Sequence, residues 1–108
     1  MGNTGIEISS LCLGTMTFGS GADEKTSVAI FRRCREAGIN FFDCADVYAG
    51  GGSEEILGEL IQDCREEIVL ITKFYGGAGD DINARGANRY HIRQAIEDSL
   101  HCLQTTAI

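Results

Sequence analysis

The chain has 108 residues, and its 16 acidic against 9 basic side chains give a formal net charge of −7. A surface of this sign repels phosphate backbones, so we expect no nucleic-acid partner. No apolar run is long enough for a membrane span, so we expect no membrane contact. The five cysteines contain no CxxC pair, which indicates reduced thiols rather than a zinc site. Together these features predict a cytoplasmic protein.

Short apolar runs alternate with amphipathic segments along the whole chain. Residues 6–9 alternate apolar and polar side chains, as an edge strand does. Asp23 is a suitable N-cap for a helix that ends at about Ala37, before Gly38. Ser53 and Asn88 are suitable N-caps for two further helices. The expected strands are 11–15, 39–43 and 67–72; the expected helices are 23–37, 54–63 and 89–104.

Each expected helix has one apolar face. The expected core positions on the helices are Val28, Phe31, Cys34, Ala37, Ile56, Leu57, Leu60, Ile61, Ile92, Ile96, Leu100 and Leu103. Between the last strand and the last helix lies a long glycine-rich loop, residues 74–87, and residues 107–108 resemble the opening of a fourth strand.

The repeated strand–helix alternation predicts a parallel sheet with right-handed crossovers. We expect one α/β domain over residues 1–108. One face of the sheet faces the helices, and the other is expected to carry Leu11, Leu13, Ile39, Phe41, Val69 and Ile71, although a shift of register exchanges some of these with their neighbours.

Three side chains meet in this scheme at the carboxyl end of the sheet. Asp43 closes one strand, Lys73 follows the next, and Tyr48 lies in the loop above them. An ammonium group beside a phenol lowers the pKa of the phenol, and a carboxylate keeps the ammonium charged, which suits proton donation. The alternative reading is structural: a loop tyrosine that packs, and an ordinary Asp–Lys salt bridge.

Several separated motifs resemble one family. The segments are 38–43 (GINFFD), 45–48 (ADVY), 53–58 (SEEILG) and 71–73 (ITK). In this order and spacing they resemble the N-terminal part of aldo-keto reductases, and the likeness runs from about residue 2 to residue 105. The resemblance implies a partial TIM (β/α)8 barrel: about three β-α units and the start of a fourth strand.

The resemblance also implies roles for the three side chains. Tyr48 is the proton donor, Lys73 tunes it, and Asp43 is the partner of the lysine and lies near the nicotinamide. The implied reaction is NADPH-dependent reduction of small aldehydes or ketones to alcohols. No metal is implied.

Two departures limit what this chain does alone. A complete barrel needs about 250 residues, and the family's catalytic histidine and most of its NADP(H) site correspond to positions after Ile108. His91 and His101 both fall in the expected helix 89–104. We therefore expect a fragment of a reductase, inactive and without tight NADPH binding by itself; the alternative is a non-catalytic half-barrel that acts as an interaction module. Its expected partners are a second copy of itself or a chain carrying the missing barrel half.

The two glycine-rich loops do not resemble phosphate cradles. The first, 49–52, is followed by Glu54 and Glu55, which repel phosphate at the helix N-terminus. The second, 76–79, is followed by Asp80 and Asp81 and has no P-loop lysine.

Overall fold

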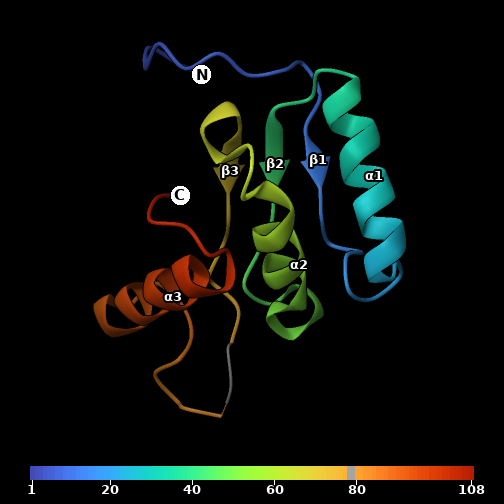
Figure 1. Ribbon diagram of the computed structural model, residues 1–108. Helices are drawn as coiled ribbons and strands as arrows, with labels where there is room; N and C mark the ends of the chain where they lie inside the picture. Colours follow the sequence, from blue (N-terminus) through green and yellow to red (C-terminus); the bar gives the residue numbers. More distant parts are fainter. Residues whose placement is uncertain (78–79) are drawn as a thin grey trace.

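The computed structural model describes residues 1–77 and 80–108, so positions 78–79 of the expected glycine-rich loop lie outside the described residues. Three strands form one parallel sheet in the order β1–β2–β3 (Figure 1). The strands are β1 (Leu13–Gly14), β2 (Phe41–Asp43) and β3 (Val69–Ile71). The predicted parallel α/β architecture is confirmed, with strands shorter than the apolar runs that form them.

Three helices accompany the strands in chain order. They are α1 (Glu24–Glu36), α2 (Gly52–Ile61) and α3 (Arg89–Cys102), with short 3-10 turns η1 (Tyr48–Gly51) and η2 (Arg65–Glu67). α2 contacts both α1 and α3, and it lies in front of the sheet in Figure 1. The molecule is only 21 Å thick in its shortest dimension, which fits one layer of helices on one layer of sheet.

The boundaries of α1 confirm the sequence prediction. Asp23 is the N-cap, and its side chain accepts a hydrogen bond of 2.8 Å from the Thr26 amide. The helix ends before Gly38, whose φ of +79° suits a residue without a Cβ. Phe31 is buried and its ring centroid lies 5.1 Å from that of Phe42. Ala37, expected on the buried face, is exposed.

The core lies between the helices and one face of the sheet. Phe42 of β2 and Leu70 of β3 are paired side by side and are 0% and 5% exposed. The cluster contains Phe31, Phe42, Cys44, Leu57, Ile61, Ile68, Leu70 and Leu103. Burial of these side chains is the main favourable term that holds the two layers together.

The opposite face of the sheet remains partly open. Phe41, Val69 and Ile71 alternate with the core residues and are only half-buried. Leu13 was also expected on this face, but its pairing with Phe42 places it against the core cluster instead. The expected inner face is thus right for β2 and β3 and out of register by one residue in β1.

Two segments expected as strands have no strand structure. In residues 6–9 the chain is held by Asn40, whose side-chain oxygen accepts from the Ser9 amide at 2.7 Å and whose side-chain nitrogen donates to the Glu7 carbonyl at 3.1 Å. These bonds to a side chain replace the ladder that an edge strand requires. At residues 107–108 the Ala107 carbonyl accepts a hydrogen bond from Arg65.

The start of α2 also differs from the prediction. Gly51, with φ of +99°, is the N-cap, and Ser53 lies inside the first turn. The Ser53 hydroxyl is used for contacts across the sheet rather than for its own helix, because it lies 2.8 Å from the Thr15 carbonyl oxygen. A long-range contact therefore overrides the local capping preference.

The buried face of α3 is rotated from the expected one. Asn88 is the N-cap as predicted, and Leu103 is buried. However, His91, Ala95 and Ser99 are the buried residues within the helix. Ile92 and Leu100 are half-buried and Ile96 is 42% exposed, so the apolar stripe lies one residue away from the packed face.

This rotation accompanies a close approach of two backbones at Gly58. A Cβ at this position of α2 would lie 2.6 Å from the Cys102 carbonyl oxygen and 2.8 Å from Leu103 Cα. Only glycine fits a contact of this kind without movement of the backbone.

Gly58→Ala is expected to lower the free energy of unfolding by about 1–3 kcal/mol, the range for overpacking, despite the higher helix propensity of alanine. Chemical denaturation measures this difference. Gly52→Ala is the matched control, because its Cβ would meet only Ala49 Cβ at an ordinary 3.6 Å. Equal stability of the two variants would contradict the close packing of α2 on α3.

Candidate functional site

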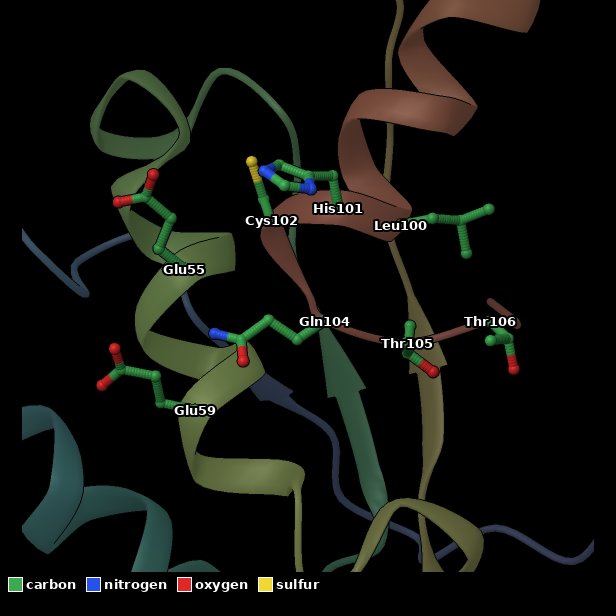
Figure 2. Close-up of a pocket in the computed structure, with 8 residues that line it drawn as sticks. All are labelled: Glu55, Glu59, Leu100, His101, Cys102, Gln104, Thr105 and Thr106. Carbon is green, nitrogen blue, oxygen red and sulfur yellow. The ribbon is translucent and has the colours of Figure 1, made fainter.

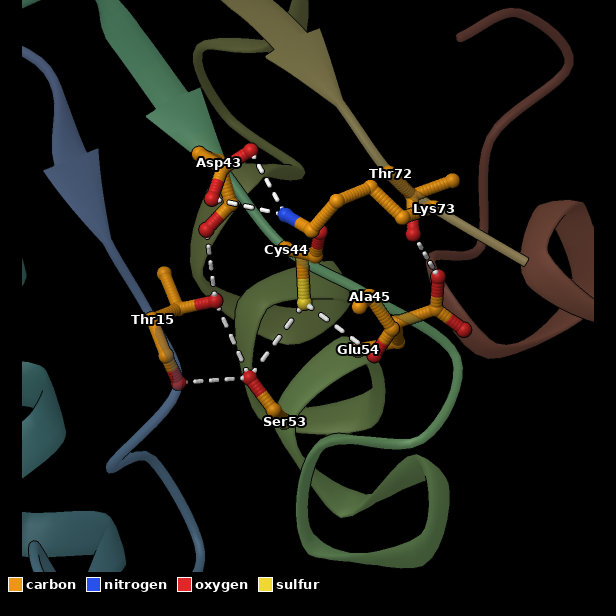
Figure 3. Close-up of polar contacts among 8 residues, drawn as sticks. All are labelled: Thr15, Asp43, Cys44, Ala45, Ser53, Glu54, Thr72 and Lys73. Atoms are coloured by element: carbon orange, nitrogen blue, oxygen red, sulfur yellow. Dashed lines mark hydrogen bonds and ion pairs between the residues drawn. The ribbon is translucent and has the colours of Figure 1, made fainter. Parts of the chain in front are cut away.

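Asp43 and Lys73 form an ion pair at the carboxyl end of the sheet. Lys73 Nζ lies 2.7 Å from each Asp43 carboxylate oxygen and 2.6 Å from the Cys44 carbonyl oxygen (Figure 3). The Lys73 side chain is 46% exposed and the Asp43 side chain is 36% exposed. The ammonium thus uses three acceptors and remains accessible from the open face of the sheet.

The backbone brings these two residues together. Asp43 pairs with Ile71, and the ladder continues beyond both strands, since the Cys44 amide donates to the Ile71 carbonyl at 2.8 Å and the Asp46 amide to the Lys73 carbonyl at 3.0 Å. Side chains two residues apart in extended chain point to the same face. Lys73 therefore projects on the face that carries Ile71 and Asp43.

Tyr48 completes the predicted trio. Its ring centroid lies 5.1 Å from Lys73 Nζ, within the range of a cation–π contact. Tyr48 opens η1, where Ala49, Gly50 and Gly51 have φ of +51°, +64° and +99°. Three successive left-handed residues turn the chain sharply from the loop into α2, and the two glycines adopt this conformation without a steric penalty.

The surroundings of Lys73 favour its charged form. Burial acts to lower the pKa of Lys73, but hydrogen bonding and charge attraction to Asp43 and Tyr48 outweigh it and raise the pKa above the ordinary 10.5. The lysine is therefore an ammonium ion throughout the neutral range.

A second polar cluster lies behind the trio, on the helix side of the sheet. The Ser53 hydroxyl lies 2.8 Å from the Thr15 carbonyl oxygen, 3.0 Å from the Thr15 hydroxyl and 3.3 Å from Cys44 Sγ. All three residues are fully buried. Cys44 points toward the helices, opposite to its neighbour Asp43, and burial raises the pKa of its thiol.

Glu54 is a buried acid that the sequence reasoning did not find as part of a site. It is 2% exposed and accepts a hydrogen bond of 2.5 Å from the Thr72 hydroxyl. Burial raises the pKa of Glu54, and the bond from Thr72 opposes the rise. Glu55 beside it is exposed, and nothing in the sequence distinguishes the two neighbouring glutamates.

Asp46 is a second such acid. Both of its carboxylate oxygens are buried without a hydrogen-bond partner among the described residues. Burial raises the pKa of Asp46, while the adjacent Val47 backbone and the charge of His91 oppose the rise. Its position between Asp43 and Tyr48 is the sequence signal that could have pointed to it.

Neither histidine joins the trio. His91 is buried, and its Nε2 lies 2.7 Å from the Phe74 carbonyl oxygen. His101 lies in the last turn of α3. It lines a cleft of about 620 Å³ between α2 and the end of α3, together with Glu55, Glu59 and Cys102 (Figure 2). Within the part of the chain that the structure describes, no three His, Cys, Asp or Glu side chains are grouped for a metal ion.

No helix of the described residues has both the length and the apolar composition that crossing a membrane requires. All five cysteines are free thiols; Cys12 is exposed and Cys44 is buried.

Asp43→Asn is expected to bring the pKa of Lys73 down toward or below 10.5, because it removes the negative charge and one of the two oxygen acceptors that raise it. NMR titration of the Lys73 side chain measures the shift, with Asp63→Asn as the control for loss of one exposed acid. A raised lysine pKa stabilises the fold fully below 10.5, and this contribution is lost as the pH rises through the raised value. The wild type should therefore lose more stability than Asp43→Asn in that alkaline window, and equal losses would contradict the pairing.

Comparison with known proteins places this geometry in one family. The sequence profile of the aldo/keto reductase family matches residues 10–108. A probable voltage-gated potassium channel subunit beta of Oryza sativa subsp. japonica is 42% identical over 105 residues, which cover 93% of this chain and 31% of the relative. The aldo-keto reductase YhdN of Bacillus subtilis (strain 168) is 39% identical over 98% of this chain and 34% of its own length.

Solved structures of aldo-keto reductases are similar to this chain in fold. The holo form of the aldo-keto reductase AKR11C1 from Bacillus halodurans superposes with a TM-score of 0.87 at 31% identity, over 99% of this chain and 36% of that one. The chain spans about a third of the length of the relatives it matches, and its three strands and helices form part of a family barrel, as predicted. The chain belongs to the aldo/keto reductase family.

Proposed function

We propose that this chain provides the proton-donating corner of an NADPH-dependent reductase of small aldehydes and ketones. The observation that carries the proposal is the contact of Lys73 Nζ with both Asp43 carboxylate oxygens at 2.7 Å, with the Tyr48 ring 5.1 Å away. An isolated surface salt bridge would not require a phenol beside it. The family membership and the names of the enzyme relatives support the same reaction class.

In this proposal each of the three side chains has one role. Tyr48 Oη donates its proton to the carbonyl oxygen of the substrate as that oxygen gains negative charge. Lys73 stabilises the charge left on the phenolate oxygen, and Asp43 holds the ammonium in place. Tyr48 then regains a proton from solvent. NADPH, when bound, supplies the hydride to the carbonyl carbon.

The residues of this chain fit only the reacting end of the cofactor. Asp43 and Lys73 offer half-exposed polar groups on the open face, which suit a nicotinamide amide group. Among the residues that the structure describes, the phosphates find no comparable site: the loop 49–52 leads into Glu54 and Glu55, and these acids disfavour an anion at the N-terminus of α2. We therefore assign the remaining cofactor contacts to the later strands and loops of the family barrel. The proposed location of the protein is the cytoplasm.

Tyr48→Phe is expected to lower kcat for carbonyl reduction by about 10²–10⁴-fold, the usual contribution of a positioned general acid, with little change in NADPH affinity. The assay combines this chain with a polypeptide that carries the remaining strands of a family barrel. Tyr90→Phe is the matched control, because Tyr90 is 63% exposed on α3. Full turnover by Tyr48→Phe would assign the proton to another group, and no turnover by the wild-type mixture would contradict the enzyme proposal.

NADPH is expected to bind this chain alone only weakly, since the phosphate contacts are lacking and the net charge of −7 opposes a polyanion. Fluorescence titration of NADPH with the purified chain tests this. Saturable micromolar binding at one site per chain would contradict the assignment of the cofactor contacts.

A second candidate function is a non-catalytic interaction module. The observation that favours it is the apolar surface at the β3 side of the sheet, where Ile71, Phe74, Ile96 and Ile108 line a groove of about 250 Å³. One relative is by name a channel subunit, so the family includes a protein described as a component of an assembly. The occupant in this proposal is a second copy of the chain or a chain with the missing barrel strands.

The chain by itself is expected to form a dimer or larger oligomer, because the half-buried Phe41, Val69 and Ile71 leave an apolar sheet face for a partner. Light scattering at several protein concentrations measures the mass. A cooperatively folded monomer of 11.6 kDa would contradict self-association.

A further inference from the structure

The first turn of α2 contacts the ends of all three strands through two adjacent side chains. Ser53 reaches Thr15, just after β1, and Cys44, just after β2. Glu54 accepts from Thr72, just after β3. Figure 3 shows these contacts on the helix side, with the Asp43–Lys73 pair on the other side of the same strand ends.

Two of the residues that α2 contacts, Thr15 and Thr72, are connected directly to the Asp43–Lys73 pair, the first by hydrogen bonds and the second by a peptide bond. The Thr15 amide and hydroxyl both donate to the Asp43 carbonyl, at 2.9 Å and 3.1 Å. Thr72 immediately precedes Lys73, and side chains of neighbouring residues in extended chain point to opposite faces. Any movement of Thr72 relative to α2 therefore moves Lys73 relative to Asp43.

The same turn also holds the loop that carries Tyr48. η1 (Tyr48–Gly51) leads directly into α2 at Gly52, through the sharp left-handed turn at Ala49, Gly50 and Gly51. The contacts of Ser53 and Glu54 fix this end of the loop, while the Tyr48 amide donates to the Ala45 carbonyl at 3.1 Å near its start. Both ends of the short segment are thereby tied to the strand ends.

Glu54 is a costly residue for a purely structural role. A carboxyl group that is 2% exposed loses its hydration, and an apolar side chain of similar size is often neutral or stabilising in such a position. Its carboxylate faces Thr72 on the helix side, so it has no contact with a reacting group on the open face. A buried hydrogen bond of this kind can hold the helix and the strand end in one relative position, because breaking it would leave a buried polar group unpaired.

We propose that Ser53 and Glu54 are positioning residues, which fix Asp43, Lys73 and Tyr48 relative to one another by joining the first turn of α2 to the three strand ends. The importance of this positioning for catalysis rests on the proposed function. The positioning itself can be tested by a measurement that does not depend on enzymatic activity. The readout is the Lys73 ammonium group, observed by ¹H–¹⁵N NMR as the exchange rate of its protons with water at neutral pH.

Thr72→Val keeps the shape of the side chain and removes the hydroxyl that Glu54 accepts from. We expect exchange of the Lys73 ammonium protons to become roughly fivefold faster, which corresponds to the loss of one hydrogen bond, and Thr72→Ser to restore the wild-type rate. Glu54→Leu is expected to match Thr72→Val. Glu55→Leu, which removes the exposed neighbouring charge, is the control and should leave the rate unchanged.

The near-isosteric Thr72→Val decides the outcome even where Glu54→Leu fails to fold. Wild-type exchange in Thr72→Val would overturn the proposal, as would equal acceleration by Glu55→Leu, which would reduce the effect to general electrostatics. Faster exchange in Thr72→Val together with an inactive wild-type reductase mixture would keep the positioning role and refute only the enzymatic one.

Discussion

The register of β2 against β3 is the constraint on which the rest of the structure depends. Asp43 lies beside Ile71, and the ladder continues to Lys73. Because successive side chains alternate between the faces, a slip of β3 by one residue would turn Lys73 toward the helices and Leu70 away from the core. The same register therefore determines both the hydrophobic core and the ion pair, and the burial of Phe42 and Leu70 selects it.

Two layers of side chains use the same strand ends for different purposes. On the open face, Lys73 uses three oxygen acceptors and stays accessible. On the helix face, Ser53 and Glu54 are buried and hydrogen-bonded. The accessible side carries the pair to which we assign the proposed chemistry, and the buried side has the contacts that we propose restrict its geometry. Neighbouring residues at the strand ends thus face a buried cluster on one side and an accessible ion pair on the other.

Local sequence signals were sufficient where the determining contacts are local. The capped start of α1 at Asp23 and the β-α alternation follow from neighbouring residues, and the trio follows from where apolar runs end. The prediction failed where distant residues decide: Ser53 is drawn into the helix by Thr15, 38 positions away, and the face of α3 is set by the approach of Leu103 to Gly58. Glu54 and Glu55 differ only in what surrounds them after folding. Whether the trio is catalytic remains a prediction.

The burial of Cys44 has a practical consequence. Its thiol is inaccessible, at 0% exposure, whereas Cys12 is exposed. A thiol-specific reagent in water therefore meets Cys12, and to a smaller extent the half-buried Cys34, Cys64 and Cys102, in the intact molecule, but Cys44 only after α2 has separated from the sheet. The rate at which Cys44 is alkylated thus reports how often the layers separate, and the protein contains its own chemical probe of local opening.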